Sequence, residues 1–340
     1  MPDYTVTSSR YAVTENLTTL QAHILAEESL HEQATGDFTW ILSAISLAGR
    51  AIANKVRRAR VDDVLGEAGA ENVHGERQQK LDIIANELIT RCLGDRANVG
   101  VIASEEGETP TILRSRSDGG RYCIAFDPLD GSSNLDVSVG VGTIFSIFRN
   151  DQEEVETGEG LFMQPGHRQV GAGYILYGSS TVFVVTTGNG VNMFVLDPAI
   201  GTFVLVKRSI TIPHEQRIYS VNEAYRDNFP KPYQDYLEWA HENGYSSRYI
   251  GSMVADVHRT LLKGGVFLYP PTKKHAKGKL RLMYEANPMG MLIEQAGGAA
   301  TNGHGRILDI HPSALHERTP VILGSSREVE HVMRFMESGG

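Results

Sequence analysis

The chain has 340 residues, with 32 Lys and Arg against 41 Asp and Glu, which gives a formal net charge of −9. This balance disfavours a surface for nucleic acid or for an anionic membrane, because both need an excess of positive charge. No stretch approaches the roughly 18 apolar residues of a membrane span, and the N-terminus lacks the charged start and apolar core of a secretion signal. The two cysteines, Cys92 and Cys123, lie in apolar runs typical of reduced core residues. We therefore expect a cytoplasmic protein of about two domains.

The first part of the chain predicts helices followed by a series of strands. Apolar residues recur with a helical period over 17–33, 37–60 and 79–93. Residues 61–77 are rich in Gly and charge without a period, so they predict a loop. Short apolar runs predict strands around Ile102 and Ile124 and over 143–149, 171–176, 181–187, 191–196 and 203–207.

A second unit begins near residue 218. It alternates predicted helices over 232–241, 252–262, 288–295 and 327–336 with predicted strands over 266–268, 280–284, 307–310 and 320–323. The composition thus indicates layered α and β elements. We place the two domains at residues 1–207 and 208–340.

The run 127–134, Asp-Pro-Leu-Asp-Gly-Ser-Ser-Asn, is the most informative motif of the chain. It follows an apolar run that predicts a buried strand, so Asp127 would stand where strand and loop meet. A tight turn can bring the carboxylates of Asp127 and Asp130 and the Leu129 carbonyl toward one hard cation such as Mg²⁺. Gly131 permits a sharp exit, and the two serines after it can open a helix whose amides and hydroxyls favour a phosphate.

Other interpretations of this run are weaker or remain open. A surface turn uses the same residue types, so it stays an alternative for the motif on its own. A calcium loop needs acids at its first, third and fifth positions, whereas the acids here stand first and fourth. Phosphatases that form an aspartyl-phosphate carry two acids two residues apart, a spacing that is also missing.

Further acids stand at the ends of other apolar segments. Glu105 and Glu106 follow the apolar run 99–103, so they also come where a strand ends. Asp82 borders the apolar face of its predicted helix, where it is either half-buried beside another group or a solvated helix acid. Glu285 ends another apolar run, where an unpaired charge would be costly.

These residues together carry a family resemblance. The chain resembles class I fructose-1,6-bisphosphatases, of the lithium-sensitive, magnesium-dependent sugar phosphatase superfamily. The Glu105-Glu106 pair and the run 127–134 mark the superfamily. The branch is indicated by the blocks at 219–223, 248–256, 267–270 and 278–285, and the match runs from about residue 35 to about residue 324.

The resemblance implies a fold, a reaction and partners. The fold is mixed α/β (α+β), a layered α-β-α-β-α sandwich of two fused domains. The reaction is hydrolysis of the 1-phosphate of D-fructose 1,6-bisphosphate in gluconeogenesis and carbohydrate metabolism, by a homotetramer that AMP inhibits. The implied cofactor is Mg²⁺, with Mn²⁺ or Zn²⁺ as alternatives, at about two to three ions per subunit. A sedoheptulose 1,7-bisphosphatase, alone or as a dual activity, remains a second hypothesis. A metal- and nucleotide-binding regulator without catalysis is a third, against which the intact acidic set argues.

The resemblance also assigns residues of the active site. The metal ligands are Glu105, Asp127, Asp130, Glu285 and the Leu129 carbonyl. The catalytic acids are Glu106 and Asp82, which would orient or deprotonate the attacking water, together with Glu105 and Glu76. Glu76 stands where family members carry Asp, and its extra methylene moves the carboxylate.

The substrate-binding residues follow from the same blocks. They are Asp130, Gly131, Ser132, Ser133, Asn222, Tyr225, Arg248, Tyr249, Met253, Tyr269, Lys279 and Arg281. The two serines would hold the 1-phosphate, Arg281 would add a fixed cation near the metals, and Arg248 would reach in from a neighbouring subunit. By contrast, Lys273, Lys274 and Lys277 are interpreted as a solvated charge run.

An AMP site is implied at the start of the second predicted helix. Its residues are Thr35, Gly36, Asp37 and Thr39, with Arg121, Tyr122 and Arg149 on adjoining strands. Helix-start amides favour anions. Arg121 stands where the animal enzymes carry Lys, which differs in hydrogen-bonding geometry. The alternative is an ordinary helix start beside a surface strand.

Overall fold

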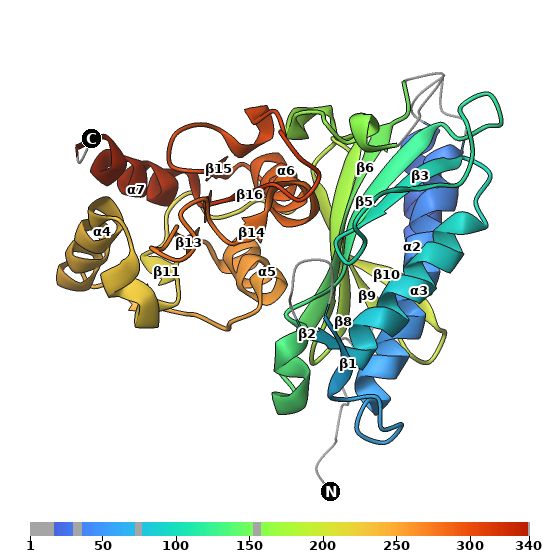
Figure 1. The fold of residues 1–340 in the computed structure, drawn as a ribbon, viewed down its shortest axis with the longest axis horizontal. Coiled ribbons are helices and arrows are strands. Elements are labelled where there is room, and N and C mark those ends of the chain that lie inside the picture. Colours follow the sequence, from blue (N-terminus) through green and yellow to red (C-terminus); the bar gives the residue numbers. More distant parts are fainter. Residues whose placement is uncertain (1–16, 30–35, 72–76, 152–157, 339–340) are drawn as a thin grey trace, which may run out of the picture.

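The computed structural model describes residues 17–29, 36–71, 77–151 and 158–338 (Figure 1). The helices are α1 (Leu20–Glu28), α2 (Asp37–Arg58), α3 (Lys80–Gly94), α4 (Lys231–Glu242), α5 (Met253–Lys263), α6 (Asn287–Gln295) and α7 (Ser326–Ser338). The strands are β1 (Glu67–Glu71), β2 (Arg77–Gln79), β3 (Val99–Ser104), β4 (Thr111–Ile112), β5 (Tyr122–Asp130), β6 (Val141–Arg149), β7 (Gly171–Tyr177), β8 (Thr181–Thr186), β9 (Val191–Asp197), β10 (Thr202–Lys207), β11 (Ile218–Ser220), β12 (Ser246–Ser247), β13 (Val266–Tyr269), β14 (Leu280–Arg281), β15 (Ala299–Thr301), β16 (Arg318–Thr319) and β17 (Val321–Gly324). Among these described residues, no helix combines the length and apolar character needed to cross a membrane.

The larger sheet organises the described part of the N-terminal half. Its eight strands run in the order β10-β9-β8-β7-β6-β5-β3-β4. Neighbouring strands are antiparallel except β3 and β5, which are parallel. The carboxyl ends of two parallel neighbours meet at one edge of a sheet, and ligands often bind there. The acids that follow β3 therefore lie beside those at the end of β5.

The second sheet and the helices complete a sandwich of five layers. The smaller sheet has the order β12-β11-β13-β17-β15. Helices α1, α2 and α3 cover the outer face of the large sheet, α5 and α6 lie between the two sheets, and α4 and α7 cover the far face of the small one (Figure 1). The predicted layered α-β-α-β-α fold is thus confirmed.

Apolar side chains fill each interface between layers. On α2, the buried Ile41, Ile45 and Ile52 keep a helical spacing and pack in one core cluster with Phe145 and Phe183 of the large sheet. That spacing is why this segment forms a helix with one apolar face. Each such side chain contributes about 1.5–3 kcal/mol when it is buried.

The middle layer forms a second core between the sheets. Val254 and Val257 of α5 and Leu292 of α6 pack there with Tyr174 and Val184 of the large sheet. This packing fixes α5 and α6 against the large sheet.

Most predicted elements are present, and the exceptions are short segments. The predicted loop 61–77 contains β1 and the first residue of β2, and these two strands pair antiparallel. The predicted strand 280–284 is wrong after Arg281, because Leu282–Ala286 forms a π-helical turn that leads into α6. The predicted strand 307–310 is also wrong, since Ile307–Asp309 is a 3-10 helix. The last two segments are apolar and mostly buried, so their sequences have no solvent-facing period that would distinguish helix from strand.

Candidate active site

A cavity of about 370 Å³ lies where the two halves of the chain meet, and we call it the acidic cavity. Its walls come from the ends of β3 and β5, the start of α5, strand β13 and the β14–α6 segment. It brings together many of the predicted site residues: Glu105, Glu106, Asp127, Leu129, Asp130, Gly131, Ser132, Ser133, Tyr249, Met253, Tyr269, Lys279, Arg281 and Glu285.

Three carboxylates converge in this cavity. Ligand oxygens of Asp127, Asp130 and Glu285 all lie within 4.8 Å of one another. Burial raises the pKa of Asp127 well above its ordinary value, and the nearby charges of Glu105, Asp130 and Glu285 raise it further, while Arg281 opposes them. Carboxylates forced together in this way favour either a proton or a cation between them.

The start of α5 holds Asp130 in place. Its Oδ2 accepts hydrogen bonds from the Val254 backbone N–H at 2.9 Å and from the Ser252 hydroxyl at 3.1 Å. Burial nevertheless raises the pKa of Asp130 to about 6, with these two hydrogen bonds acting in the opposite direction. The carboxylate of Asp130 is therefore fixed in position, in surroundings that disfavour its negative charge.

Arg281 connects two further acids at the edge of the cluster. Its guanidinium Nη1 lies 2.5 Å from Glu105 Oε1, and both side chains are buried. Its backbone N–H donates to Glu285 Oε2 at 2.6 Å. The backbone N–H of Glu105 in turn donates to the Phe126 carbonyl at 2.9 Å, which extends the β3–β5 pairing up to the cavity. The strand ends and the π-helical turn therefore share one charged network.

Glu106, which lines the acidic cavity, has a second acid, Asp82, close enough for its charge to act on it. Glu106 accepts a hydrogen bond from Gln78 Nε2 at 2.8 Å. Asp82 is buried in the first turn of α3, where its carboxylate accepts from the Gln79 backbone N–H at 2.8 Å. Burial and the charge of Glu106 raise the pKa of Asp82 to about 7, against hydrogen bonds from Gln79 and Ser132. A group that titrates near neutrality thus stands beside Glu106, as acid-base chemistry needs.

The exit from β5 depends on a glycine. Gly131 has φ of 75°, in the left-handed region, and a Cβ added there would lie 2.9 Å from the Ser252 side chain. The short 3-10 helix Ser132–Val137 follows at once and presents Ser132 and Ser133 to the cavity. The predicted helix opening after the acidic turn is therefore present, as a 3-10 helix.

A second cavity of about 640 Å³ adjoins the first, and we call it the tyrosine cavity. Among the predicted residues it is lined by Asn222, Tyr225, Tyr249, Tyr269 and Lys279. The last three also line the acidic cavity, so the two cavities share a wall.

Besides Lys279, two further lysines line the tyrosine cavity, whereas Arg248 does not. Lys273 and Lys274, interpreted as a solvated charge run, are exposed as predicted but also line the cavity. Arg248 is exposed, and its guanidinium donates to the Ser247 carbonyl at 2.7 Å. It is not among the described residues that line either cavity of its own chain.

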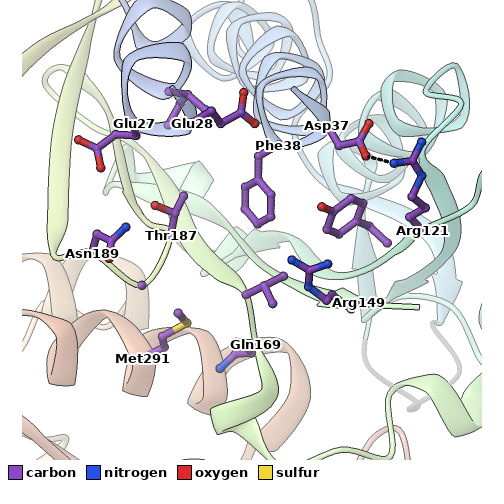
Figure 2. Close-up of a pocket in the computed structure, with 14 residues that line it drawn as sticks. Glu27, Glu28, Asp37, Phe38, Arg121, Arg149, Gln169, Thr187, Asn189 and Met291 are labelled. Carbon is purple, nitrogen blue, oxygen red and sulfur yellow. Dashed lines mark ion pairs between the residues drawn. The ribbon is translucent and has the colours of Figure 1, made fainter. Parts of the chain in front are cut away.

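A separate pocket of about 570 Å³ lies between α1, α2 and the large sheet, and we call it the α2 pocket (Figure 2). Asp37, Arg121, Tyr122 and Arg149 of the predicted AMP set line it. Figure 2 shows Arg121 paired with Asp37, at 3.0 Å, while Arg149 points into the centre near Phe38.

The remaining residues of that set are placed differently. Thr39 donates from its backbone N–H and its hydroxyl to the Glu28 carboxylate, at 3.3 and 2.8 Å. Gly36, with φ of 77°, stands directly before α2. Thr35, and the catalytic candidate Glu76, lie outside the described residues.

The structure adds residues that sequence reasoning did not assign. Ser252 and Asp256 line the acidic cavity, and Gln78 binds Glu106. Glu28, Gln169 and Met291 line the α2 pocket. Asp256 carried one usable signal, because an acid flanked by apolar residues on a buried helix must have a partner.

Comparison with known proteins identifies the family. The family model "Fructose-1-6-bisphosphatase, N-terminal domain" matches residues 18–208, and its C-terminal counterpart matches residues 212–337. The class 1 fructose-1,6-bisphosphatase of Persephonella marina is 49% identical over 318 residues, covering 93% of this chain and 98% of that protein. The corresponding protein of Chlorobium phaeobacteroides is 48% identical over 322 residues, covering 92% of this chain and 96% of that protein.

Solved structures agree with this result. Leishmania major fructose-1,6-bisphosphatase in its holo form superposes with a TM-score of 0.90 at 43% identity, covering 95% of this chain and 99% of that one. The T-state of the same enzyme superposes with a TM-score of 0.84 at 41% identity, covering 94% and 99% of the two chains. With both family domains matched and relatives nearly half identical over almost the whole chain, this protein belongs to the class 1 fructose-1,6-bisphosphatase family.

Proposed function

We propose that this phosphatase hydrolyses the 1-phosphate of D-fructose 1,6-bisphosphate, giving fructose 6-phosphate and inorganic phosphate. One observation carries the proposal. The carboxylates of Asp127, Asp130 and Glu285 converge within 4.8 Å in a cavity that shares a wall with a second, tyrosine- and lysine-lined cavity. Two joined cavities suit a sugar with a phosphate at each end. The names of the relatives support the same substrate.

The acidic cavity is suited to hold Mg²⁺. Its donors are all oxygens, which hard cations prefer, and the raised pKa values of Asp127 and Asp130 indicate charge that a cation would relieve. We assign Asp127, Asp130, Glu285, Glu105 and the Leu129 carbonyl as the ligands. Bound Mg²⁺ supplies charge for the phosphate oxygens and the leaving alkoxide and lowers the pKa of a bound water.

The chain's own residues position the reactants and move the proton. We assign removal of the proton from the attacking water to Glu106, assisted by Asp82, whose pKa burial raises to about 7. Ser132 and Ser133 would hold the 1-phosphate with their hydroxyls and backbone amides. Arg281 keeps the Glu105 carboxylate in one orientation.

The far phosphate would bind in the tyrosine cavity. We assign Asn222, Tyr225, Tyr249, Tyr269 and Lys279 to it, because hydroxyls, an amide and an ammonium all donate to phosphate oxygens.

We further propose a homotetramer in which Arg248 completes a neighbouring subunit's tyrosine cavity. The exposed position of its guanidinium, away from the cavities of its own chain, supports this role. We place the division between the domains near residue 207, so that Glu285 and Arg281 of the second domain join the acids of the first.

AMP inhibition is proposed at the α2 pocket. Arg121, Arg149 and Tyr122 offer donors to a phosphate, and the pocket has room for a nucleotide. The carboxylates of Glu27, Glu28 and Asp37 in the same pocket oppose an anion, so binding would require Arg121 to leave Asp37 (Figure 2).

A steady-state assay of phosphate release tests the substrate. Fructose 1,6-bisphosphate, sedoheptulose 1,7-bisphosphate and fructose 1-phosphate are compared at saturating Mg²⁺. The proposal expects the highest kcat/KM for fructose 1,6-bisphosphate. A higher value for sedoheptulose 1,7-bisphosphate would replace the assigned substrate, and equal turnover of the monophosphate would remove the far-phosphate site.

A further inference from the structure

We propose that Asp256 is a positioning residue, which fixes the loop 248–252 and thereby sets the affinity for the far phosphate of the substrate. This inference rests on the proposed function, because it assigns a role in the tyrosine cavity. Asp256 lies in the first turn of α5 and is 1% exposed. Its backbone N–H donates to the Ser252 carbonyl at 2.9 Å, so its own position is set by the helix start.

The carboxylate of Asp256 collects donors from two separate segments. Oδ1 accepts from the Ile250 backbone N–H at 2.9 Å and from the Ser220 hydroxyl at 2.7 Å. Oδ2 accepts from the Gly251 backbone N–H at 2.9 Å. Ser220 ends β11, whereas the two amides belong to the loop 248–252. One buried carboxylate thus joins the loop to the small sheet.

This hydrogen bonding argues against direct contact between Asp256 and substrate. A carboxylate has about four acceptor positions, and three are occupied by the donors just named. Its negative charge would also repel a phosphate. Asp256 therefore acts through the loop, although it forms part of the wall of the acidic cavity.

The loop carries residues of the far-phosphate site on one side. Tyr249 lines both cavities, and in the tyrosine cavity it shares the lining with Asn222, whose side chain acts on the pKa of the Tyr249 hydroxyl. The backbone N–H of Arg248 donates to the Tyr219 carbonyl of β11 at 2.9 Å. Tyr249 is therefore held between one anchor on β11 and a second on Asp256. Because β11 also leads to Asn222, Asp256 controls the register between Tyr249 and Asn222.

The other side of the loop has separate anchors at the acidic cavity. Asn134 Nδ2 donates to the Gly251 carbonyl at 2.9 Å, and the Ser252 hydroxyl donates to Asp130. These contacts remain when the Asp256 carboxylate is lost. A change at Asp256 should therefore weaken binding of the far phosphate more than it disturbs the metal ligands.

The test is the Asp256→Asn variant, in which an amide N–H₂ faces the N–H donors and the fixed charge is gone. For fructose 1,6-bisphosphate we expect KM to rise roughly tenfold, as expected when hydrogen bonds to a charged group are lost, while kcat falls less than about threefold. For fructose 1-phosphate, which lacks the far phosphate, kcat/KM should stay within about twofold. The contact that the substitution weakens is made only to that phosphate. The Mg²⁺ concentration for half-activation should not change.

Three further variants keep the result interpretable. Ser220→Ala removes a single donor and should raise KM for the bisphosphate in the same direction by a smaller factor. Asp235→Asn, at an exposed acid of α4 paired with Lys231, is the matched control and should leave all constants unchanged. In a Tyr249→Phe background, Asp256→Asn should raise KM by less than it does alone, because both act on one contact.

Three results would overturn the positioning role. They are an equal KM increase for fructose 1,6-bisphosphate and fructose 1-phosphate, a loss in kcat alone, and effects on KM that are fully additive with those of Tyr249→Phe. If the Asp256→Asn protein does not fold, an unchanged KM for fructose 1,6-bisphosphate in Ser220→Ala would overturn the positioning role. Failure of the proposed function looks different, since the unmodified protein would then not prefer the bisphosphate over fructose 1-phosphate.

Discussion

Arg281 and Glu105 form a buried ion pair, with guanidinium Nη1 and carboxylate Oε1 2.5 Å apart at the edge of the acidic cluster. The pair joins the end of β3 to the segment that leads into α6, and the Arg281 backbone also binds Glu285. A single arginine thus orients acids from both halves of the chain. It offsets only part of the negative charge around Asp127, since the pKa of that residue is still raised.

Replacing Asp127 by Asn should abolish activity without unfolding the protein. We expect kcat to fall at least about 100-fold, because a metal ligand and its several kcal/mol of transition-state stabilisation are lost. The metal-free variant should melt at the same or a higher temperature than the unmodified protein, since one member of a repelling group is removed. Turnover and melting curves measure both effects. The control is Asp118→Asn at a surface turn, and near-normal turnover in a folded Asp127→Asn protein would contradict the assignment.

Mg²⁺ activation should depend on pH through Asp130. Burial raises the pKa of Asp130 from 3.8 to about 6 without metal, so protons compete with the cation below that value. The half-activating Mg²⁺ concentration should rise as the pH falls through about 6.

The stability of the metal-free protein should depend on pH in the opposite direction, so that low pH favours the folded state. The folded state binds this proton more tightly than the unfolded state, so the Asp130 contribution is complete below 3.8 and is lost as the pH rises through about 6. Metal titrations and melting curves at several pH values check both signs, and a pH-independent Mg²⁺ requirement would argue against Asp130 as a ligand.

Arg248→Ala should raise KM for fructose 1,6-bisphosphate by about tenfold and change kcat little. The lost contact to the far phosphate exists in both ground and transition states, so it contributes uniform binding. Arg334→Ala, at an exposed arginine of α7, is the matched control. Mixed tetramers provide the sharper test. Subunits carrying Arg248→Ala should lower the affinity of unmodified neighbours, and a fully active monomer would contradict the shared site.

AMP should inhibit the enzyme at fixed Mg²⁺ through the α2 pocket. Arg149→Ala should raise the inhibitory AMP concentration by at least about tenfold, because a charge-assisted hydrogen bond to phosphate is removed. Asp37→Asn should lower that concentration, since it frees Arg121 from its ion pair. Arg116→Ala, at an exposed arginine whose guanidinium donates to the Asp151 carbonyl, should have no effect. An absence of inhibition up to millimolar AMP would remove the nucleotide site and leave the catalytic proposal untouched.

Much of the fold could be predicted because its long elements have clear periods. The apolar stripe of α2 and the runs of β5 and β6 are read directly from the sequence. Leu282–Ala286 could not be, because every residue in it is buried, Glu285 included, so the segment shows no solvent-facing period that would separate helix from strand. The short strands β11 and β15 have three residues each, too few for a period to show.

The site also has a part that the sequence predicts and a part that it does not. The acids at 105, 106, 127 and 130 follow apolar strands, so their meeting at one sheet edge follows from local sequence together with parallel pairing. Asp256 and Ser220 lie 36 positions apart, and their hydrogen bond depends on how α5 packs against β11. Likewise, Glu28 meets Thr39 only because α1 returns beside α2. Contacts of this kind are set by tertiary packing, which no local pattern records.

Phosphorus NMR of the reaction tests the central claim most directly. The purified protein is incubated with fructose 1,6-bisphosphate and Mg²⁺, in parallel with the Asp127→Asn variant, and the phosphate signals are followed with time. The account predicts that the 1-phosphate signal of the substrate decays, that inorganic phosphate and fructose 6-phosphate grow in equal amounts, and that the variant and a chelator-treated sample show no change. Release of the 6-phosphate instead, or a folded, Mg²⁺-loaded protein that leaves both signals intact, would contradict it.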